Sequence, residues 1–172
     1  MTPERPHRVC PWWLGYMLVS PLRRIFNPPA KMLAGHVRPG MTVLEPGPGM
    51  GFFTLELARL VGGSGRVIAV DIQPRMLDGL RRRAAKAGVL DRVDARLAAP
   101  DSLGLADLEG VVDFTLASAV VHELPAAATF FREVGGPRSR GRGCSWWNQR
   151  GTSELRCLTP NCRRPRRPGS RW

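Results

Sequence analysis

The cysteine pattern of this 172-residue chain excludes two common kinds of site. Its four cysteines, Cys10, Cys144, Cys157 and Cys162, include no Cys-x-x-Cys spacing. Zinc sites and disulfide frameworks are both recognised by regular cysteine spacings, and neither is supported here. We therefore expect no metal and no disulfide scaffold.

Long apolar runs are also missing. The apolar stretch near the N-terminus, Val9–Val19, is 11 residues long and contains Pro11 and Gly15. A membrane-spanning helix needs roughly 20 predominantly apolar residues. We therefore expect no transmembrane segment and a location in the cytoplasm.

Negative charge is nearly absent from the C-terminal part of the chain. The formal charge is +12, but residues 1–134 hold 16 Lys and Arg against 13 Asp and Glu. Residues 135–172 hold 10 Arg against the single Glu154. Because the basicity belongs to this tail, the net charge does not indicate a nucleic-acid binder, and we expect no specific nucleic-acid partner.

The most informative motif lies at residues 42–51, Thr-Val-Leu-Glu-Pro-Gly-Pro-Gly-Met-Gly, and is followed by residues with helical spacing. A β-branched apolar run, a turn with alternating glycines and a helical pattern predict a strand, a tight turn and a helix. Asp71 ends the next apolar run, 20 residues after Gly51. A doubly wound fold places the carboxylate that binds a ribose hydroxyl at this distance, so we predict a nucleotide-like cofactor.

The glycine spacing distinguishes between two cofactors. Gly47, Gly49 and Gly51 form G-x-G-x-G, whereas the dinucleotide fingerprint is G-x-G-x-x-G. Glu45 precedes the first glycine by two residues, and its charge would repel a pyrophosphate but attract a cation. The pattern resembles motif I of the class I S-adenosylmethionine-dependent methyltransferases. An ordinary turn with incidental glycines is disfavoured, because Glu45, the glycine spacing and Asp71 agree.

This resemblance implies a binding site for S-adenosyl-L-methionine. Glu45 and the glycines would lie at the methionine end, where the ammonium and sulfonium groups are cationic, and Asp71 would bind the ribose hydroxyls. The cofactor-binding residues expected in all are Glu45, Gly47, Gly49, Gly51, Asp71, Ile72, Asp101 and Ser118.

Two further residues have alternative interpretations. Asp101 lies where the family places residues around the adenine, but Pro100-Asp101-Ser102 equally suits a turn with a helix N-cap. His122 lies in a segment that resembles the family's methyl-transfer site, and it is our candidate for a catalytic general base. The alternative is that His122 and Glu123 only shape the loop and cap the next helix.

Strand and helix patterns alternate through residues 38–134, which predicts an α/β fold, a Rossmann-like doubly wound parallel sheet with helices on both faces. The expected strands begin at Thr42 and cover residues 66–70, 93–97 and 111–117, and the expected helices cover residues 51–61, 74–87 and 126–134. We interpret Arg81-Arg82-Arg83 as the solvated face of its helix.

Residues 1–37 are assigned to an N-terminal helical cap, interrupted by prolines and containing Trp12 and Trp13. In the family that the chain resembles, this position covers the cofactor and acceptor, and aromatic side chains would suit an apolar or planar acceptor. The alternatives are that the tryptophans pack on the core, or that Arg23 and Arg24 contact a membrane surface.

Residues 135–172 depart from the family pattern and are rich in Arg, Gly, Pro, Cys and Trp. In another reading frame, codons for residues 143–148 permit an apolar strand ending in Glu-Pro, as the family has here. We predict a frameshift near residues 134–138, a disordered Arg-rich tail and a sheet incomplete at its C-terminal strands. The fourth strand would then be an exposed edge that permits self-association.

These observations predict an S-adenosylmethionine-dependent methyltransferase that acts on a small-molecule acceptor. Pro39–Gly47 and His122–Pro125 resemble quinone-type and other small-molecule methylators more than protein or DNA methylators. One alternative is a catalytically inactive, truncated methyltransferase fragment that retains at most partial cofactor binding. Another is an NAD-dependent oxidoreductase, which would require G-x-G-x-x-G and no carboxylate at position 45.

Overall fold

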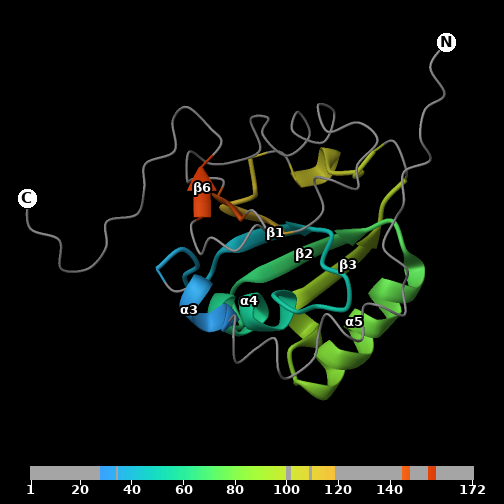
Figure 1. The fold of residues 1–172 in the computed structure, drawn as a ribbon, viewed down its shortest axis with the longest axis horizontal. Helices are drawn as coiled ribbons and strands as arrows, with labels where there is room; N and C mark the ends of the chain where they lie inside the picture. The colour runs from blue at the N-terminus through green and yellow to red at the C-terminus, as the bar shows by residue number, and fades with distance from the viewer. Residues whose placement is uncertain are drawn as a thin grey trace, which may run out of the picture.

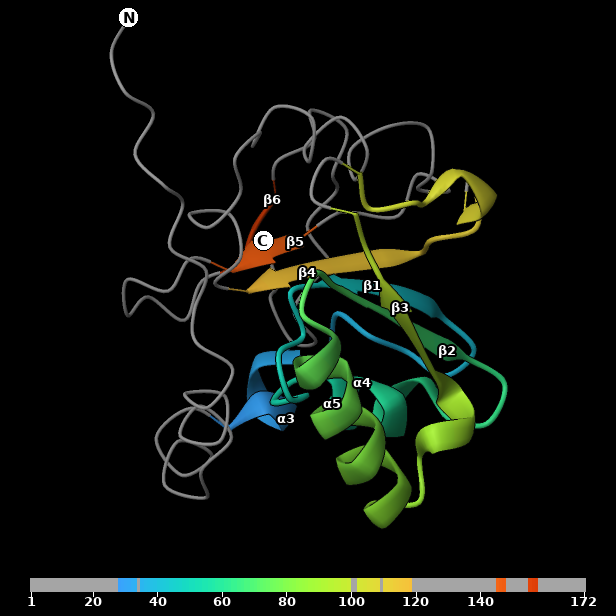
Figure 2. The ribbon, with the colours of Figure 1, turned by 90° about the vertical axis from the view of Figure 1, so that its right-hand side faces the viewer.

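The strands in the described part of the chain form one six-stranded sheet in the order β3-β2-β1-β4-β5-β6 (Figures 1 and 2). The computed structural model describes residues 28–33, 35–99, 102–108, 110–118, 145–147 and 155–157. The first five strands are parallel to their neighbours, and β6 is antiparallel to β5.

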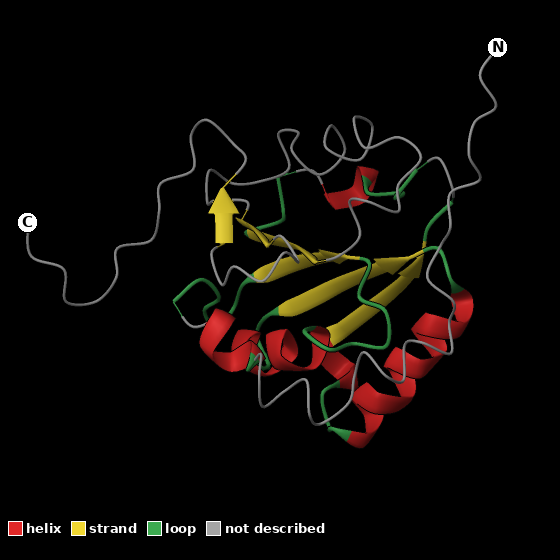
Figure 3. Ribbon diagram, in the orientation of Figure 1, coloured by secondary structure: helices red, strands yellow, loops and turns green. Residues whose placement is uncertain are grey.

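The first half of the sheet is built from alternating strands and helices. In chain order the elements are β1 (Thr42–Pro46), α4 (Thr54–Val61), β2 (Arg66–Asp71), α5 (Pro74–Lys86) and β3 (Val93–Leu97). Figure 3 shows both helices on the same face of the sheet. The longest described helix, α5, has 13 residues, and no helix in the described part of the chain has the length and apolar character needed to cross a membrane.

After β3 the chain reverses direction across the sheet. It passes through a 3-10 turn, η2 (Ala106–Leu108), to β4 (Phe114–Ser118), which pairs with the other side of β1. Figure 1 shows η2 over the face opposite to α4 and α5. Because parallel crossovers share one hand, a reversal moves the connection to the opposite face. The predicted doubly wound α/β fold is therefore confirmed, and its reversal point lies between β1 and β4.

Two short elements precede β1 and follow α5. α3 (Pro29–Leu33) lies beside α4, and the 3-10 turn η1 (Leu90–Arg92) connects α5 to β3. The predicted helix at residues 126–134 lies outside the described residues. The same holds for residues 1–27 of the proposed cap.

The core has two layers, one on each face of the sheet. Along β2, Val67 and Ala69 belong to the layer under the helices, whereas Ile68 and Val70 belong to the layer under η2. All four side chains are at most 1% exposed. Alternate residues of a strand point to opposite faces, so a continuous apolar run is what a strand covered on both faces requires.

The helix α4 begins three residues later than predicted. We expected a helix from residue 51, but α4 begins at Thr54. Gly51 has φ +83°, which is left-handed and cannot belong to a right-handed helix, and its N–H donates to the carbonyl of Pro48 at 2.9 Å. Residues 51–53 are therefore part of the turn.

The predicted exposed edge at β4 was wrong. β5 (Ser145–Trp147) pairs with β4 in parallel, and β6 (Leu155–Cys157) pairs with β5. Figure 2 shows β5 beside β4. A strand pairs through its main-chain N–H and C=O groups, whose pairing does not require a particular set of side chains. The pairing of β5 with β4 therefore left no pattern in the sequence. Self-association through β4 therefore loses its basis, whereas the proposed frameshift stays a prediction.

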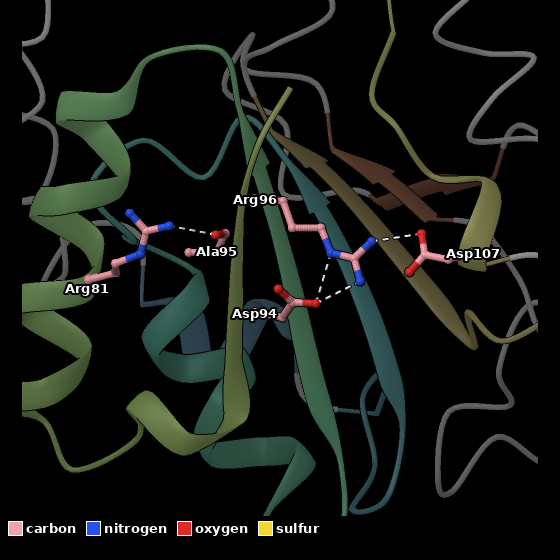
Figure 4. A network of polar contacts seen from close by, with 5 residues as sticks. All are labelled: Arg81, Asp94, Ala95, Arg96 and Asp107. Atoms are coloured by element: carbon pink, nitrogen blue, oxygen red, sulfur yellow. Dashed lines mark hydrogen bonds and ion pairs between the residues drawn. The ribbon is translucent and has the colours of Figure 1, made fainter. Parts of the chain in front are cut away.

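The outer strand β3 is hydrogen-bonded to α5 on one face of the sheet and to η2 on the other, as Figure 4 shows. The guanidinium of Arg96 donates to Asp94 on the same strand and to Asp107 of η2, both at 2.8 Å. Arg81 of α5 donates to the carbonyl of Ala95 at 2.7 Å. The hydrogen bond from Arg96 lowers the pKa of Asp107. A strand covered with charge in this way discourages pairing with another chain.

We expect Asp113 to be important for stability, because it joins the starts of β1 and β4. Its Oδ2 accepts a hydrogen bond from the N–H of Thr42 at 3.0 Å, and its own N–H donates to the Thr42 carbonyl at 2.9 Å. Asp113→Ala should lower the free energy of unfolding by about 1–2 kcal/mol, measured by urea denaturation. The control is Asp78→Ala, which removes only an exposed ion pair with Arg81 and should change it by less than about 0.5 kcal/mol. Equal losses would contradict this role of Asp113.

Candidate functional site

Two acidic residues and the glycine turn meet where β1 and β2 end. Glu45 pairs with Ala69 in the parallel ladder, and Pro46 pairs with Val70. The ladder then continues for one more bond, from the N–H of Gly47 to the carbonyl of Val70 at 2.8 Å. In a doubly wound sheet, ligands bind beside the carboxyl ends of the strands. This is the end of the sheet at which these residues lie.

Glu45 is buried beneath the glycine turn. Its side chain is on the last part of β1 and the residue is 1% exposed. Its Oε2 accepts a hydrogen bond from Oγ1 of Thr54, the first residue of α4, at 2.6 Å. This bond therefore closes the turn by joining the residue before it to the residue after it.

The surroundings of Glu45 favour the protonated carboxyl group. Its pKa is raised to about 8, chiefly by burial; the hydrogen bond from Thr54 partly opposes the rise, and the negative charge of Asp71 adds to it. A buried carboxylate loses its hydration, and a second carboxylate nearby adds repulsion. The site is therefore one in which a cation would be stabilised.

Asp71 connects the glycine turn to the loop that follows β2. Its Oδ2 accepts the N–H of Gly49 at 3.2 Å, and its Oδ1 accepts the N–H of Gln73 at 2.9 Å. The two bonds hold the carboxylate between the glycine turn and the loop after β2. Asp71 therefore positions two loops at the carboxyl ends of β1 and β2.

The three glycines of the turn all have left-handed backbones. Their φ values are +67° at Gly47, +54° at Gly49 and +83° at Gly51. Their N–H groups donate within the protein, to Val70, Asp71 and Pro48 respectively. In a phosphate-binding loop such groups point at the ligand instead. Here the glycines provide the shape of the turn and not a cradle of donors.

Gly49 and Gly51 have different surroundings. No atom lies within 4 Å of the position that a Cβ would take at Gly49, so the backbone there faces open space. At Gly51 a Cβ would collide with Leu80 Cδ1 and lie 2.9 Å from Leu55 Cδ1. Gly49 thus leaves room beside the turn, whereas Gly51 allows α4 and α5 to pack closely against it.

Apolar side chains lie exposed at the same edge of the sheet. Ile72, directly after β2, is 40% exposed, and Leu97, the last residue of β3, is 60% exposed. The register pairs Asp71 with Leu97. Ile72 is a predicted site residue, whereas nothing in the sequence distinguishes Leu97, because one apolar residue at a strand end resembles any other.

The remaining predicted residues are placed only in part. Ser118 is the last residue of β4, which lies next to β1, and only its backbone is described. Asp101 and His122 lie outside the described residues. In the described ranges, no group of three or more His, Cys, Asp or Glu side chains is arranged to hold a metal ion.

The structure adds two residues that the sequence pattern did not identify. Thr54 binds Glu45, and its only sequence signal is a hydroxyl residue at the start of a helix. The guanidinium of Arg83 donates to the main-chain carbonyl of Met50 in the turn. The interpretation of Arg81–Arg83 as a solvated face is wrong for Arg83, which is half-buried, whereas Arg81 and Arg82 are exposed.

Comparison with known proteins identifies the class. Residues 43–135 match a family described as a methyltransferase domain. This match covers more than half of the chain, so the chain belongs to the class I S-adenosylmethionine-dependent methyltransferases. The predicted family and its cofactor, S-adenosyl-L-methionine, are thereby confirmed.

Individual relatives differ in what they methylate. The chain is 31% identical over 99 residues to a ribosomal protein L11 methyltransferase of Symbiobacterium thermophilum, covering 58% of this chain and 31% of the relative. It is 38% identical over 71 residues to a ubiquinone/menaquinone biosynthesis C-methyltransferase of Klebsiella pneumoniae, covering 41% and 28%. The chain thus spans about a third or less of these curated relatives' length.

A solved structure shares the fold. The crystal structure of a S-adenosylmethionine-dependent methyltransferase from Aquifex aeolicus superimposes with a TM-score of 0.73 at 24% sequence identity. The comparison covers 84% of this chain and 79% of the other. At this identity the likeness concerns the fold alone.

Gly49→Ala and Gly51→Ala form a matched pair of substitutions. Both positions have positive φ, so alanine strains the backbone at either by about 1–2 kcal/mol. At Gly51 the new methyl group also meets Leu80 and Leu55, which should cost about 1–3 kcal/mol more. We expect Gly51→Ala to lower the free energy of unfolding more than Gly49→Ala, measured by urea denaturation. Equal losses would contradict the tight packing at Gly51.

The raised pKa of Glu45 predicts how stability depends on pH. The unfolded carboxyl titrates near 4.5 and the folded one near 8, so between these values the folded state binds a proton that the unfolded state has lost. Stability should therefore fall as pH rises through this window and level off above it. Glu45→Gln keeps an acceptor for Thr54 but cannot ionise, so its free energy of unfolding should fall less between pH 5 and 8.

Urea denaturation at several pH values measures this difference. The control is Glu56→Gln, which changes a carboxylate of α4 that pairs with Arg59. This control should keep the pH dependence of the wild type. If Glu45→Gln also keeps it, Glu45 is not the group responsible.

Proposed function

We propose that this chain binds S-adenosyl-L-methionine at the glycine turn and transfers its methyl group to an acceptor. The observation that carries the proposal is the pair of carboxyl groups, Glu45 and Asp71, on a turn whose three glycine N–H groups already donate within the protein. A cation bound beside Glu45 would favour its ionised form, and the turn offers few free donors, so the site suits a cationic ligand better than a pyrophosphate.

Different described residues would contact different parts of the cofactor. Glu45 would face the cationic methionine end from beneath the turn, and Gly49 would let the ligand approach the backbone. Asp71 would bind the ribose hydroxyls, because it lies at the carboxyl end of β2, where doubly wound folds place this carboxylate. Ile72 and Leu97 would cover the base with apolar surface, since both are exposed beside Asp71.

Three residues complete this proposal on the strength of the sequence resemblance. Asp101 would lie near the adenine amino group, and Ser118 would line the site from the end of β4. His122 would serve as general base for a hydroxyl or amine acceptor. The methyl group of the cofactor is already activated at its sulfonium, so alignment of the acceptor should supply most of the rate.

We propose a small molecule as the acceptor and the cytoplasm as the location. The support for the acceptor is the likeness of Pro39–Gly47 and His122–Pro125 to quinone-type methylators and the similarity to the C-methyltransferase from Klebsiella pneumoniae. The similarity to a ribosomal protein methyltransferase supports a protein acceptor instead. The choice can be made by supplying each class of acceptor with labelled cofactor.

The second candidate is a chain that binds the cofactor without transferring its methyl group. The observation that favours it is the change of composition after residue 135, where the family match ends. Binding of S-adenosylhomocysteine without methyl transfer to any acceptor would support this alternative.

Calorimetric titration of the full chain with S-adenosylmethionine, S-adenosylhomocysteine and NAD tests the proposed function. We expect micromolar binding of the first two and none of NAD. Asp71→Asn should weaken binding by about tenfold or more, because an amide N–H₂ would replace an acceptor facing Gly49, Gln73 or the ribose. The control is Asp94→Asn, which alters a carboxylate bound to Arg96 on β3 and should leave the affinity unchanged. Binding of NAD, or of none of the three, would overturn the proposal.

A further inference from the structure

The helix α5 contacts the glycine turn through one face. Arg83 lies three residues after Leu80 and four after Gly79, so it neighbours both of them on the helix surface. Leu80 packs where a Cβ of Gly51 would be, and a Cβ at Gly79 would lie 2.9 Å from Cγ and 3.2 Å from Sδ of Met50. The side chain of Met50 therefore crosses α5 at a residue that has no side chain of its own.

Arg83 binds the main chain of Met50, the residue whose side chain lies over Gly79. One turn of helix after Gly79, its guanidinium donates to the carbonyl oxygen of Met50. Met50 is 2% exposed although it belongs to a turn between a strand and a helix. Both its side chain and its carbonyl group are thus fixed against α5.

Neither α5 residue is explained by the helix itself. Glycine in a helix interior is less favourable than alanine, and Gly79 lies in the interior of α5. Arg83 places a positive charge behind a turn that, by the proposed function, receives a cation, so its charge does not help the ligand. What the two residues share is contact with Met50, between Gly49 and Gly51.

We propose that Arg83 is a positioning residue for the cofactor site. By holding the Met50 carbonyl, with Gly79 leaving room for the Met50 side chain, it keeps the turn in the conformation that brings the Gly49 N–H to Asp71. Arg83 acts through Met50 and does not touch the ligand. This inference rests on the proposed function, which identifies the turn as the cofactor site.

The test compares three variants of the full chain. Arg83→Met removes the donor and keeps an unbranched aliphatic side chain, Arg83→Lys keeps a charged donor, and Arg82→Met changes the exposed neighbour. Arg83→Met should weaken S-adenosylhomocysteine binding by about tenfold, as expected for one charged hydrogen bond. Arg83→Lys should recover part of the loss, and Arg82→Met should bind like the wild type. Circular dichroism confirms that each variant is folded at the titration temperature.

A second measurement needs no ligand. Amide hydrogen exchange of residues 47–53 should be about tenfold faster in Arg83→Met than in the wild type, because the turn opens more often. Gly79→Ala should also accelerate it, since the added methyl group displaces Met50, and Met50→Ala in that background should reverse part of the effect. Exchange in β3 serves as the reference segment.

The outcomes separate this inference from the proposed function. Loss of stability in Arg83→Met with unchanged affinity and unchanged exchange in the turn would mean that Arg83 is only a structural residue, and would overturn the inference. Failure of the wild type to bind would overturn the proposed function. In that case exchange still decides whether Arg83 holds the turn, and unchanged exchange would overturn this inference as well.

Discussion

A buried carboxyl group requires a hydrogen-bond partner, and this requirement at Glu45 organises the site. The partner, Thr54, lies on the far side of the glycine turn, so the hydrogen bond between them joins the end of β1 to the start of α4. The chain can return over so short a distance only through residues that accept a left-handed backbone. Gly47, Gly49 and Gly51 meet that need.

The charge of the site follows from the same arrangement. Closing the turn brings the Gly49 N–H to Asp71 and leaves two carboxyl groups near one another at the ends of adjacent strands. Burial, and to a smaller extent the repulsion between the two groups, raises the pKa of Glu45. A bound cation would offset both the repulsion and the cost of burying an ionised Glu45. The same features therefore make the site selective for a positively charged ligand.

The rest of the fold supports the turn from two directions. The sheet fixes the ends of β1 and β2 through the ladder that continues to Gly47, and α5 fixes the middle of the turn through Met50. The reversal point of the sheet lies between β1 and β4, and ligands of doubly wound sheets bind beside the carboxyl ends of the strands at such a point. Arg96 and its partners anchor the outer strand β3, which carries Leu97 beside Asp71.

The local features of this protein were determined by its sequence. Strand, turn and helix followed from hydrophobic period and glycine spacing, and the position of Asp71 followed from chain distance, because each depends on residues close together in the chain. The partner of Arg83 was decided only by the tertiary structure, as were the burial of Glu45 on Thr54, the exposure of Leu97 and the pairing of β4 with β5. These depend on segments brought together by packing, and an arginine on a helix looks the same in sequence whether it meets water or a carbonyl 33 residues away.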